Sequence, residues 1–427
     1  MKILLVVLLS GLSAGQVFAQ GDAAKRLVVL KAARMLDVAS GRVVSPGVVV
    51  VEGDRISAVG GAQPAGAEVI DLGDVTLMPG MIDAHVHLFL HPGAEDMQTV
   101  EESVPQRVLI AADAAKKDLM GGFTAERDMG SEGAGCADVA VRNAINSGLI
   151  PGPRMRMSCN AIDLTGGHED ANRFNPAARV LSNADYADNA DEIVKVMREQ
   201  RKIGADFTKI YETGRDSYMT GVLKTPYQYT EAELKAAVAE AARTGGVAGT
   251  GRGVAVHATG EPGTGFAVAA GVESVDHADQ LSDATMRAMK EKGIFAVPTF
   301  AISEYFAQQA GGGPRRRQSQ DLHVAEFKKQ MAAGVPFAVG SDVGPFPHGT
   351  QAWEMVLMGK YGMSNADVLK ADLINSAKLL GWGDRIGQLK AGYFADVIAV
   401  KGNPLEDLEA LQKVSFVMKG GVVYRKD

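Results

Sequence analysis

The sequence predicts an α/β protein, a (β/α)8 TIM-type barrel with a small β-sandwich domain formed by both chain ends. Apolar β runs alternate with helical patterns over residues 77–384, which is typical of βα units around a parallel sheet. Short strands with period-2 alternation fill residues 20–76 and 385–427, where Gly and Pro mark the turns. The chain of 427 residues has room for a barrel of roughly 250 residues and a smaller module.

The N-terminus predicts a signal peptide over residues 1–19. Lys2 precedes an apolar run from Ile3 to Leu9, and a small-x-small arrangement ends at Ala19. The run is too short to span a membrane as a helix. We therefore expect cleavage near Ala19, export to the periplasm and no transmembrane anchor after processing. An uncleaved anchor is the alternative.

Eight strand candidates follow one another in the predicted barrel. They are Leu77 to His87, Phe123 to Asp128, Arg154 to Ala161, Asp206 to Tyr211, Val254 to Ala258, Ser274 to Ala278, Ile294 to Phe300, and Val335 to Asp342. Pro298 weakens the seventh candidate, because proline lacks the N–H that a sheet ladder needs. Two helix starts carry capping boxes, Ser103 with Gln106 and Thr230 with Glu233.

Two histidines at alternate positions end the first barrel strand. The run PGMIDAHVH over residues 79–87 places His85 and His87 on one face, because residues i and i+2 of a strand point the same way. A neutral imidazole nitrogen is among the commonest ligands of zinc and related metals. The alternative is a strand whose two histidines are satisfied by other partners.

Further polar residues stand where later strands end. Lys209 lies near the end of the fourth candidate, His257 and His277 in the fifth and sixth, and Asp342 at the end of the eighth. Barrel enzymes carry their chemistry at the C-terminal ends of the strands, so these side chains are expected to meet. Such groups are costly to bury when unpaired, whereas cations between them would compensate their charges.

The GMIDAHVH run resembles the first-strand motif of the amidohydrolase superfamily, metal-dependent hydrolases built on a (β/α)8 barrel. The resemblance extends from about Arg26 to the C-terminus and implies a binuclear centre with two divalent metal ions. The implied metal ligands are His85, His87, Lys209, His257, His277 and Asp342. Lys209 would bridge the ions as a carboxylated lysine, because a lysine ammonium has donors only. Nitrogen and oxygen ligands without thiolate suit Zn²⁺ and do not exclude manganese or cobalt.

A second run resembles a prolidase-like branch of the family, Xaa-Pro dipeptidases. In TGGH, the histidine that matches a contact to the substrate carboxylate is His168, and Tyr229 matches a tyrosine of the same branch. The resemblance implies hydrolysis of an amide bond in a dipeptide or an N-acyl amino acid by a metal-activated hydroxide, with Asp342 as general base and then acid. The branch commonly has a second histidine after the fifth-strand ligand, whereas residues 257–260 of this chain read HATG.

Two other readings of the same residues remain open. One is a cyclic amide hydrolase or a deaminase on the same scaffold, since a fold does not determine a substrate. The other is a periplasmic binding relative that has lost activity. The formal net charge of −7 leaves no basic stripe for phosphates, so nucleic acid is not an expected partner. We expect a small-molecule substrate. The sequence is compatible with a monomer and with a homo-oligomer.

The remaining distinctive residues receive structural interpretations. Cys136 and Cys159 are interpreted as two buried free thiols, although an oxidising compartment would permit a bridge. His323 is expected on a helix surface, and His348 is expected to shape a loop. The run GGGPRRR over residues 311–317 is interpreted as an exposed insertion.

Overall fold

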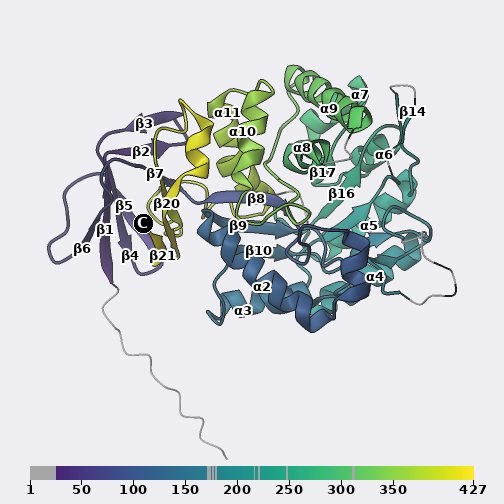
Figure 1. Ribbon diagram of the computed structural model, residues 1–427, viewed down its shortest axis with the longest axis horizontal. Coiled ribbons are helices and arrows are strands. Elements are labelled where there is room, and N and C mark those ends of the chain that lie inside the picture. Colours follow the sequence, from purple (N-terminus) through teal and green to yellow (C-terminus); the bar gives the residue numbers. More distant parts are fainter. Residues whose placement is uncertain are drawn as a thin grey trace, which may run out of the picture.

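The computed structural model describes residues 26–427, apart from 171–174, 176, 178–179, 216, 220–221, 247–248 and 310–312. The predicted signal peptide lies outside the described residues. A strand-rich part and a larger mixed α/β part lie next to each other, on the left and right of Figure 1. Among the described helices, none combines the length and the apolar character needed to cross a membrane.

Two sheets make up the strand-rich part. One has the strand order β5-β4-β1-β6, and the other has the order β21-β20-β19-β7-β2-β3, so strands from both ends of the chain share it (Figure 1, purple and yellow). Their bounds are β1 Leu27–Ala32, β2 Arg34–Asp37, β3 Arg42–Val44, β4 Gly47–Glu52, β5 Arg55–Val59, β6 Glu68–Asp71, β7 Thr76–Pro79, β19 Val397–Val400, β20 Val414–Lys419 and β21 Val422–Lys426. Buried side chains of both sheets, among them Leu30 and Phe416, pack into one core.

Parallel strands form the centre of the α/β part. The order is β10-β9-β8 in one sheet and β12-β11-β13-β16-β17-β18 in another. The bounds are β8 Met81–Val86, β9 Phe123–Asp128, β10 Arg154–Met157, β11 Ala161–Asp163, β12 Ala184–Tyr186, β13 Thr208–Tyr211, β16 Val254–Ala258, β17 Ser274–His277 and β18 Phe295–Val297; a separate hairpin joins β14 Ser217–Met219 and β15 Val222–Lys224. Their apolar runs fit strands that are covered on both faces.

Helices surround these strands (Figure 1). Their bounds are α1 Glu95–Glu101, α2 Val104–Met120, α3 Ala137–Asn146, α4 Ala190–Ile203, α5 Glu231–Arg243, α6 Gly263–Ala270, α7 Asp283–Lys292, α8 Phe300–Gln308, α9 Gly313–Ala333, α10 Ala352–Lys360, α11 Asn365–Lys370, the π-helix Ala371–Ser376, α12 Ala377–Leu379 and the 3-10 helix Leu408–Gln412. The capping box predicted at Thr230 and Glu233 is confirmed. At Ser103 the structure shows the N-cap bond from the backbone N–H of Gln106 and not the reciprocal bond of a box.

The segment 335–343, predicted as the eighth strand, connects the two parallel sheets. The backbone N–H of Ala338 donates to Ala296 O in β18 at 3.0 Å, and Ala84 in β8 donates to Val339 O at 2.8 Å. Regular pairing along this segment is limited to single parallel bridges on either side. The fold is therefore an α/β fold consistent with a TIM barrel plus a second domain.

The seventh strand is shorter than predicted. β18 ends at Val297, and α8 begins at Phe300. Between them, Pro298 has no N–H for the ladder, and Thr299 takes a positive φ of 54°. The chain therefore turns sharply at the end of this strand, beside the pocket described below.

The prediction of two free thiols is wrong, because Cys136 and Cys159 form a disulfide. Cys136 stands at the start of α3 and Cys159 follows β10, and their Cα atoms are 4.3 Å apart. The backbone N–H of Ser131 also donates to Cys159 O at 3.0 Å. The loop after β9 thus folds onto the next strand, a contact that a separation of 23 residues does not reveal in the sequence.

His323 is buried, so its predicted place on a helix surface is wrong. It is 5 % exposed and stacks on Phe300 with ring centroids 4.3 Å apart, because this face of α9 packs against α8. His348 lies in a loop, as predicted, where Nδ1 is 2.8 Å from Asp118 Oδ2 and Nε2 is 3.3 Å from Leu90 O.

The run over residues 311–317 agrees with the prediction in part. Its first two residues lie outside the described part, but residues 313–317 begin α9. Arg317 is paired with the buried carboxylate of Glu304 at 3.1 Å. Gly313, Arg316 and Arg317 are exposed, as predicted, but they belong to α9 and not to an irregular insertion.

Candidate active site

His85 lies in β8 and His87 follows that strand directly. Their Nε2 atoms are 3.2 Å apart, and both residues are buried. Gly340 allows the segment 335–343 to pack closely against His85, because a Cβ at that position would lie 2.7 Å from His85 Cβ. The alternation of the strand therefore directs both imidazoles to one point, as predicted from their spacing.

Asp342 reaches the two histidines from the segment 335–343. Its Oδ1 lies 3.4 Å from His85 Nε2 and 3.3 Å from His87 Nε2. The backbone N–H of Asp342 donates to His85 O at 2.8 Å. Its φ of 60° lies in the left-handed region, which Asp and Asn adopt more readily than other non-glycine residues. The carboxylate is thus held on both imidazoles.

The other three predicted ligands reach the same pocket from β13, β16 and β17. The rings of His257 and His277 are 4.4 Å apart, and those of His277 and His85 are 5.4 Å apart, between centroids. Lys209 is 1 % exposed, and its Nζ lies 3.8 Å from Asp276 Oδ2. The structure therefore brings all six predicted metal ligands to one pocket.

Burial and neighbouring charges determine the protonation of these groups. Burial lowers the pKa of His85 and His257 well below the usual value, and it lowers the pKa of His277 to about 4. Burial also lowers the pKa of Lys209. For Asp342, burial would raise the pKa, but the neighbouring imidazoles hold it well below its usual range. Near neutral pH, three imidazoles are uncharged and the carboxylate is ionised, as metal ligation requires.

His87 differs because it contacts two carboxylates. Burial alone would lower its pKa, but hydrogen bonds to Asp342 and Glu132 raise the pKa well above the usual value. Glu132 Oε1 lies 3.0 Å from His87 Nδ1, on the side of the ring away from Asp342. Sequence reasoning missed Glu132; the only signal was a polar residue shortly after the second strand, in the run DMGSEG over residues 128–133.

Two more contacts to the predicted ligands were not foreseen. Thr299 Oγ1 lies 2.7 Å from His277 Nδ1. Asp276 Oδ1 lies 3.7 Å from His85 Nδ1 and 3.4 Å from the guanidinium of Arg127. Thr299 and Asp276 each contact a histidine that another strand carries, so local sequence patterns gave no indication of these contacts.

The pocket has a volume of about 180 Å³. Besides the six predicted ligands, it is lined by Leu90, Glu95, Glu132, His168, Glu169, Tyr211, Ile302, Phe306 and Pro345. Burial raises the pKa of Glu95 to about 7, and burial with the nearby carboxylates Glu132 and Glu95 raises the pKa of Glu169 to about 8. The pocket is small and mostly polar, with Leu90, Ile302, Phe306 and Pro345 as the apolar part of its lining.

The two predicted substrate residues lie in different places. His168 lines the pocket, with its ring 4.3 Å from His257 and stacked on Tyr211 at 4.9 Å between centroids. Tyr229 is buried outside this lining, and its hydroxyl donates to Ala187 O at 2.9 Å. A substrate contact of Tyr229 stays a prediction that its position does not favour, whereas Tyr211, which was not predicted, faces the pocket.

The donor set fits divalent ions. Ligand atoms of His85, His277 and Asp342 all lie within 4.8 Å of one another. His257 Nε2 is buried and makes no hydrogen bond within the described part of the chain. Buried nitrogens without partners are costly, and a cation would supply the missing partner for a neutral imidazole.

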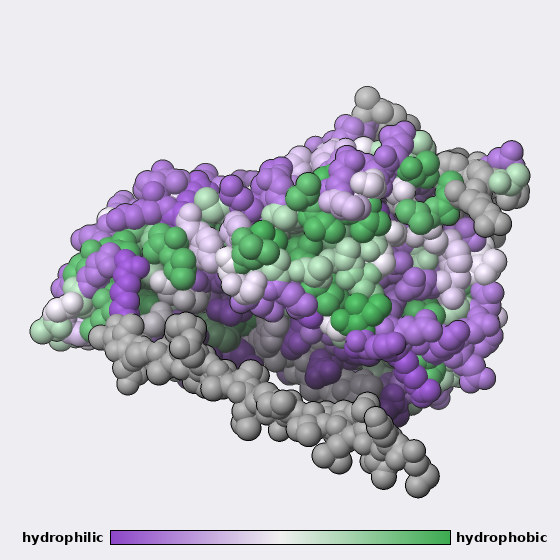
Figure 2. Space-filling model, turned by 90° about the horizontal axis from the view of Figure 1, so that it is seen from below, coloured by the Kyte–Doolittle hydropathy of each residue, from purple (hydrophilic) through white to green (hydrophobic). Residues whose placement is uncertain are grey.

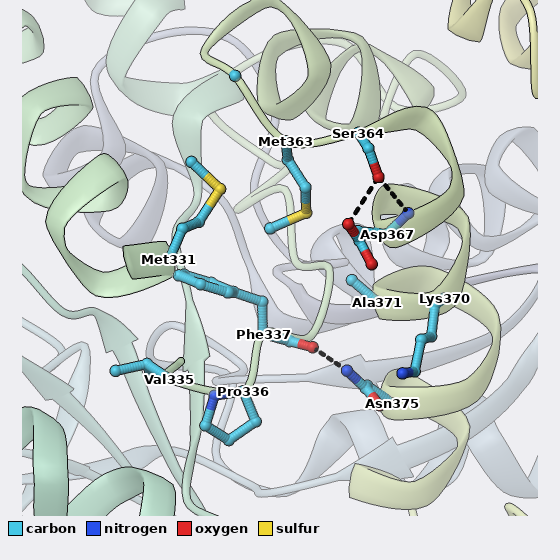
Figure 3. A pocket seen from close by; sticks show the side chains of 11 residues that line it. Met331, Val335, Pro336, Phe337, Met363, Ser364, Asp367, Lys370, Ala371 and Asn375 are labelled. Carbon is cyan, nitrogen blue, oxygen red and sulfur yellow. Dashed lines mark hydrogen bonds between the residues drawn. The ribbon is translucent and has the colours of Figure 1, made fainter. Parts of the chain in front are cut away.

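A larger cavity of about 450 Å³ lies at the other end of the segment 335–343. Residues 335–337 line it together with α9, α11 and the π-helix (Figure 3). Two of its polar side chains bond locally: Asn375 donates to Phe337 O at 2.7 Å, and Ser364 to Asp367 at 2.6 Å. The six predicted ligands lie elsewhere, so we place the chemistry in the smaller pocket.

Residues 76–424 match the amidohydrolase family. The chain belongs to this family. As an amidohydrolase it is a hydrolase that acts on amide C–N bonds, and its similarity to prolidases and to ochratoxinase is consistent with the prolidase-like branch that the TGGH run indicated.

Individual relatives of this amidohydrolase match over most of their length. The Aspergillus niger ochratoxinase is 30 % identical over 385 residues, which cover 82 % of this chain and 75 % of that protein. The crystal structure of a Xaa-Pro dipeptidase with methionine bound in its active site has a TM-score of 0.83 at 30 % identity and covers 93 % of this chain and 100 % of the dipeptidase. A prolidase complexed with N-methylphosphonate-L-proline has a TM-score of 0.82 at 26 % identity and covers 94 % of this chain and 100 % of the prolidase.

Proposed function

We propose that this amidohydrolase is a binuclear metal-dependent enzyme that hydrolyses the amide bond of a dipeptide, Xaa-Pro-like, or of an N-acyl amino acid. The observation that carries the proposal is the convergence of four histidines, one lysine and one aspartate in a single small pocket. Its similarity to a Xaa-Pro dipeptidase at 30 % identity supports the substrate class. The proposal includes a closed (β/α)8 barrel over residues 77–384, with residues 20–76 and 385–427 as the β-sandwich domain. Residues 77–79 of β7 pair with β19 and β2 of the β-sandwich, so the first barrel strand is β8.

Two divalent ions, for which Zn²⁺ is our choice, would be held by the six predicted ligands. When bound, they would activate a water molecule and polarise the carbonyl of the scissile amide. For Lys209 to ligate, its neutral amine must add to carbon dioxide, with loss of a proton, to form a carbamate. The lowered pKa of Lys209, caused by burial, favours the neutral amine that this addition needs.

Asp342 would carry the proton during hydrolysis. Its carboxylate is ionised near neutral pH and lies 3.3 Å and 3.4 Å from the imidazoles of His87 and His85. One oxygen would take a proton from the attacking water and return it to the leaving nitrogen, first as general base and then as general acid. The backbone N–H of Asp342 donates a hydrogen bond to His85 O, which holds the carboxylate in place for this proton transfer.

His168 would anchor the free carboxylate of the substrate. It lines the pocket next to His257, and burial lowers its pKa to about 4, so the ring is neutral near pH 7 and can donate one N–H. Stacking on Tyr211 fixes the plane of the ring. Anchoring of this kind orients the scissile bond, so its loss is expected to lower turnover as well as affinity.

The experiment is a panel of dipeptides and N-acyl amino acids, each tested as the free acid and as the C-terminal amide. We expect the free acids to be hydrolysed far faster, and His168→Ala to reduce the difference. Equal rates for free and amidated compounds would refute the carboxylate anchor and favour the cyclic amide hydrolase or deaminase reading. No turnover of any amide by metal-loaded protein would favour an inactive binding relative.

Export and assembly complete the proposal. We expect removal of residues 1–19 near Ala19 and function in the periplasm, which N-terminal sequencing of the protein from fractionated cells would test.

The face that includes α2 and α3 shows apolar groups among polar ones (Figure 2), and Leu109 and Leu149 are 73 % and 78 % exposed. A homo-oligomer would cover such side chains, and light scattering would reveal one.

A further inference from the structure

Glu132 holds the outer nitrogen of a predicted metal ligand. Its Oε1 lies 3.0 Å from His87 Nδ1, while His87 Nε2 faces Asp342 and His85 at 3.3 Å and 3.2 Å. Carboxylates therefore face both nitrogens of this ring. When Nε2 binds a metal ion, the ring keeps a single proton on Nδ1, where the carboxylate of Glu132 accepts it. The lone pair of Nε2 is then directed at the point where the predicted ligands meet. A second acceptor, Gly130 O, lies farther from Nδ1 at 3.4 Å.

The loop that carries Glu132 is fixed from several sides. Glu132 takes a φ of 49°, a left-handed value that a non-glycine residue keeps only where the surroundings impose it. Its carbonyl accepts from the buried guanidinium of Arg107 and from Thr99 Oγ1. The Cys136–Cys159 disulfide closes the same loop onto the next strand. Glu132 is 5 % exposed, so the carboxylate has little freedom to leave the histidine.

Gly130 makes room for this carboxylate. A Cβ at Gly130 would lie 2.8 Å from Glu132 Oε1, closer than real Cβ contacts allow. The φ of Gly130 is not in the left-handed region, so an alanine there is compatible with the backbone, and its methyl group would displace mainly the end of the glutamate side chain. Glu132 thus supplies the contact to His87, and Gly130, two residues before it, leaves the space that the glutamate side chain needs.

From these contacts we propose that Glu132 is a positioning residue that sets the tautomer and orientation of His87 for metal binding. The inference rests on the proposed metal-dependent function and goes beyond it by assigning a role to a residue outside the six predicted ligands. Outer partners of metal-bound histidines typically contribute 10- to 100-fold to metal affinity.

The test measures the free Zn²⁺ concentration at half-loading, by competition with a chromophoric chelator, together with the thermal midpoint of the metal-free protein. We expect Glu132→Ala to weaken Zn²⁺ binding by roughly 10- to 100-fold. Glu132→Gln should fall between it and the unaltered protein, because the amide oxygen can still accept from Nδ1. Gly130→Ala should resemble Glu132→Ala although it leaves the glutamate in place.

The matched control is Glu102→Gln, which alters another glutamate–histidine pair, with Glu102 Oε1 2.7 Å from His91 Nε2, away from the predicted ligands. It should leave Zn²⁺ affinity unchanged. Parental affinity in both Glu132→Ala and Gly130→Ala would overturn the inference; if Glu132→Ala does not fold, parental affinity in Glu132→Gln and Gly130→Ala would do so. Failure of the unaltered protein to bind Zn²⁺ would instead refute the proposed function itself, so the two failures are distinguishable.

Discussion

Replacing Asp342 with asparagine separates proton transfer from folding and metal binding. Asn has the same shape and, like Asp, tolerates the left-handed φ of 60° at this position. Its amide oxygen can keep a contact to the imidazoles of His85 or His87, which now lie 3.4 Å and 3.3 Å from the carboxylate. Asn has no basic oxygen near neutral pH, so it accepts no proton from water. The variant should therefore fold and retain much of its metal while losing the base.

The structure also indicates how large the loss should be. General acid–base catalysis contributes about 10²- to 10⁴-fold, or roughly 3–5 kcal/mol of activation free energy. The other carboxyl groups of the pocket are poor substitutes for the base. Glu132 is engaged with His87 Nδ1, whereas the carboxylate of Asp342 contacts the Nε2 atoms of both His85 and His87, where the predicted ligands meet. We therefore expect the whole of this loss in Asp342→Asn.

The assay is kcat and KM for a Xaa-Pro dipeptide, measured with the metal content of the same sample. We expect kcat to fall by about 10²- to 10⁴-fold, while the thermal midpoint and most of the metal are retained. A kcat within threefold of the unaltered enzyme, with metal bound, would show that the base lies elsewhere and refute this reasoning.

Three other changes give independent results. Lys209→Met should abolish activity and lower the metal content. It should not lower the unfolding midpoint, because an apolar chain of similar size replaces a buried amine 3.8 Å from Asp276. Full metal content and full activity in this variant would rule out the carbamate. Removing the disulfide with Cys136→Ser and Cys159→Ser should cost roughly 3 kcal/mol of unfolding free energy for a loop of 23 residues; urea titration giving less than about 1 kcal/mol would contradict this. Glu212 is fully buried, and burial raises its pKa to about 9, from 4.5 in the unfolded chain. Between these two pH values the folded protein keeps a proton that the unfolded chain has lost, so the free energy of unfolding falls as the pH rises from 4.5 to about 9. Glu212→Gln should therefore raise the thermal midpoint at pH 8 and not at pH 4, and equal effects at both values would show that this carboxyl is not protonated in the folded protein.

The sequence predicted what depends on local periodicity and on the order of strand ends. The alternation of His85 and His87 in a strand, the caps at Ser103 and Thr230, and the bounds of β9 and β16 follow from short-range rules, and the structure shows them. Placing chemistry at the C-terminal ends of parallel strands was enough to expect one pocket for residues from five segments.

What the sequence did not predict depends on contacts between distant segments. The Cys136–Cys159 disulfide and the Glu132–His87 contact both form where the loop after β9 folds onto a neighbouring strand end. His323 faces inward because of the packing of α9 on α8, which its polar sequence surroundings conceal. No periodicity or motif in a single chain encodes such pairings, because they depend on how the strands are arranged in space.

The most direct test of the binuclear proposal is the metal content of protein that hydrolyses a dipeptide. Elemental analysis of active, extensively dialysed enzyme should give two divalent ions per chain. Chelation should remove the ions and the activity together, and Zn²⁺ with bicarbonate should restore both. Active protein that contains no divalent ion would contradict the central claim.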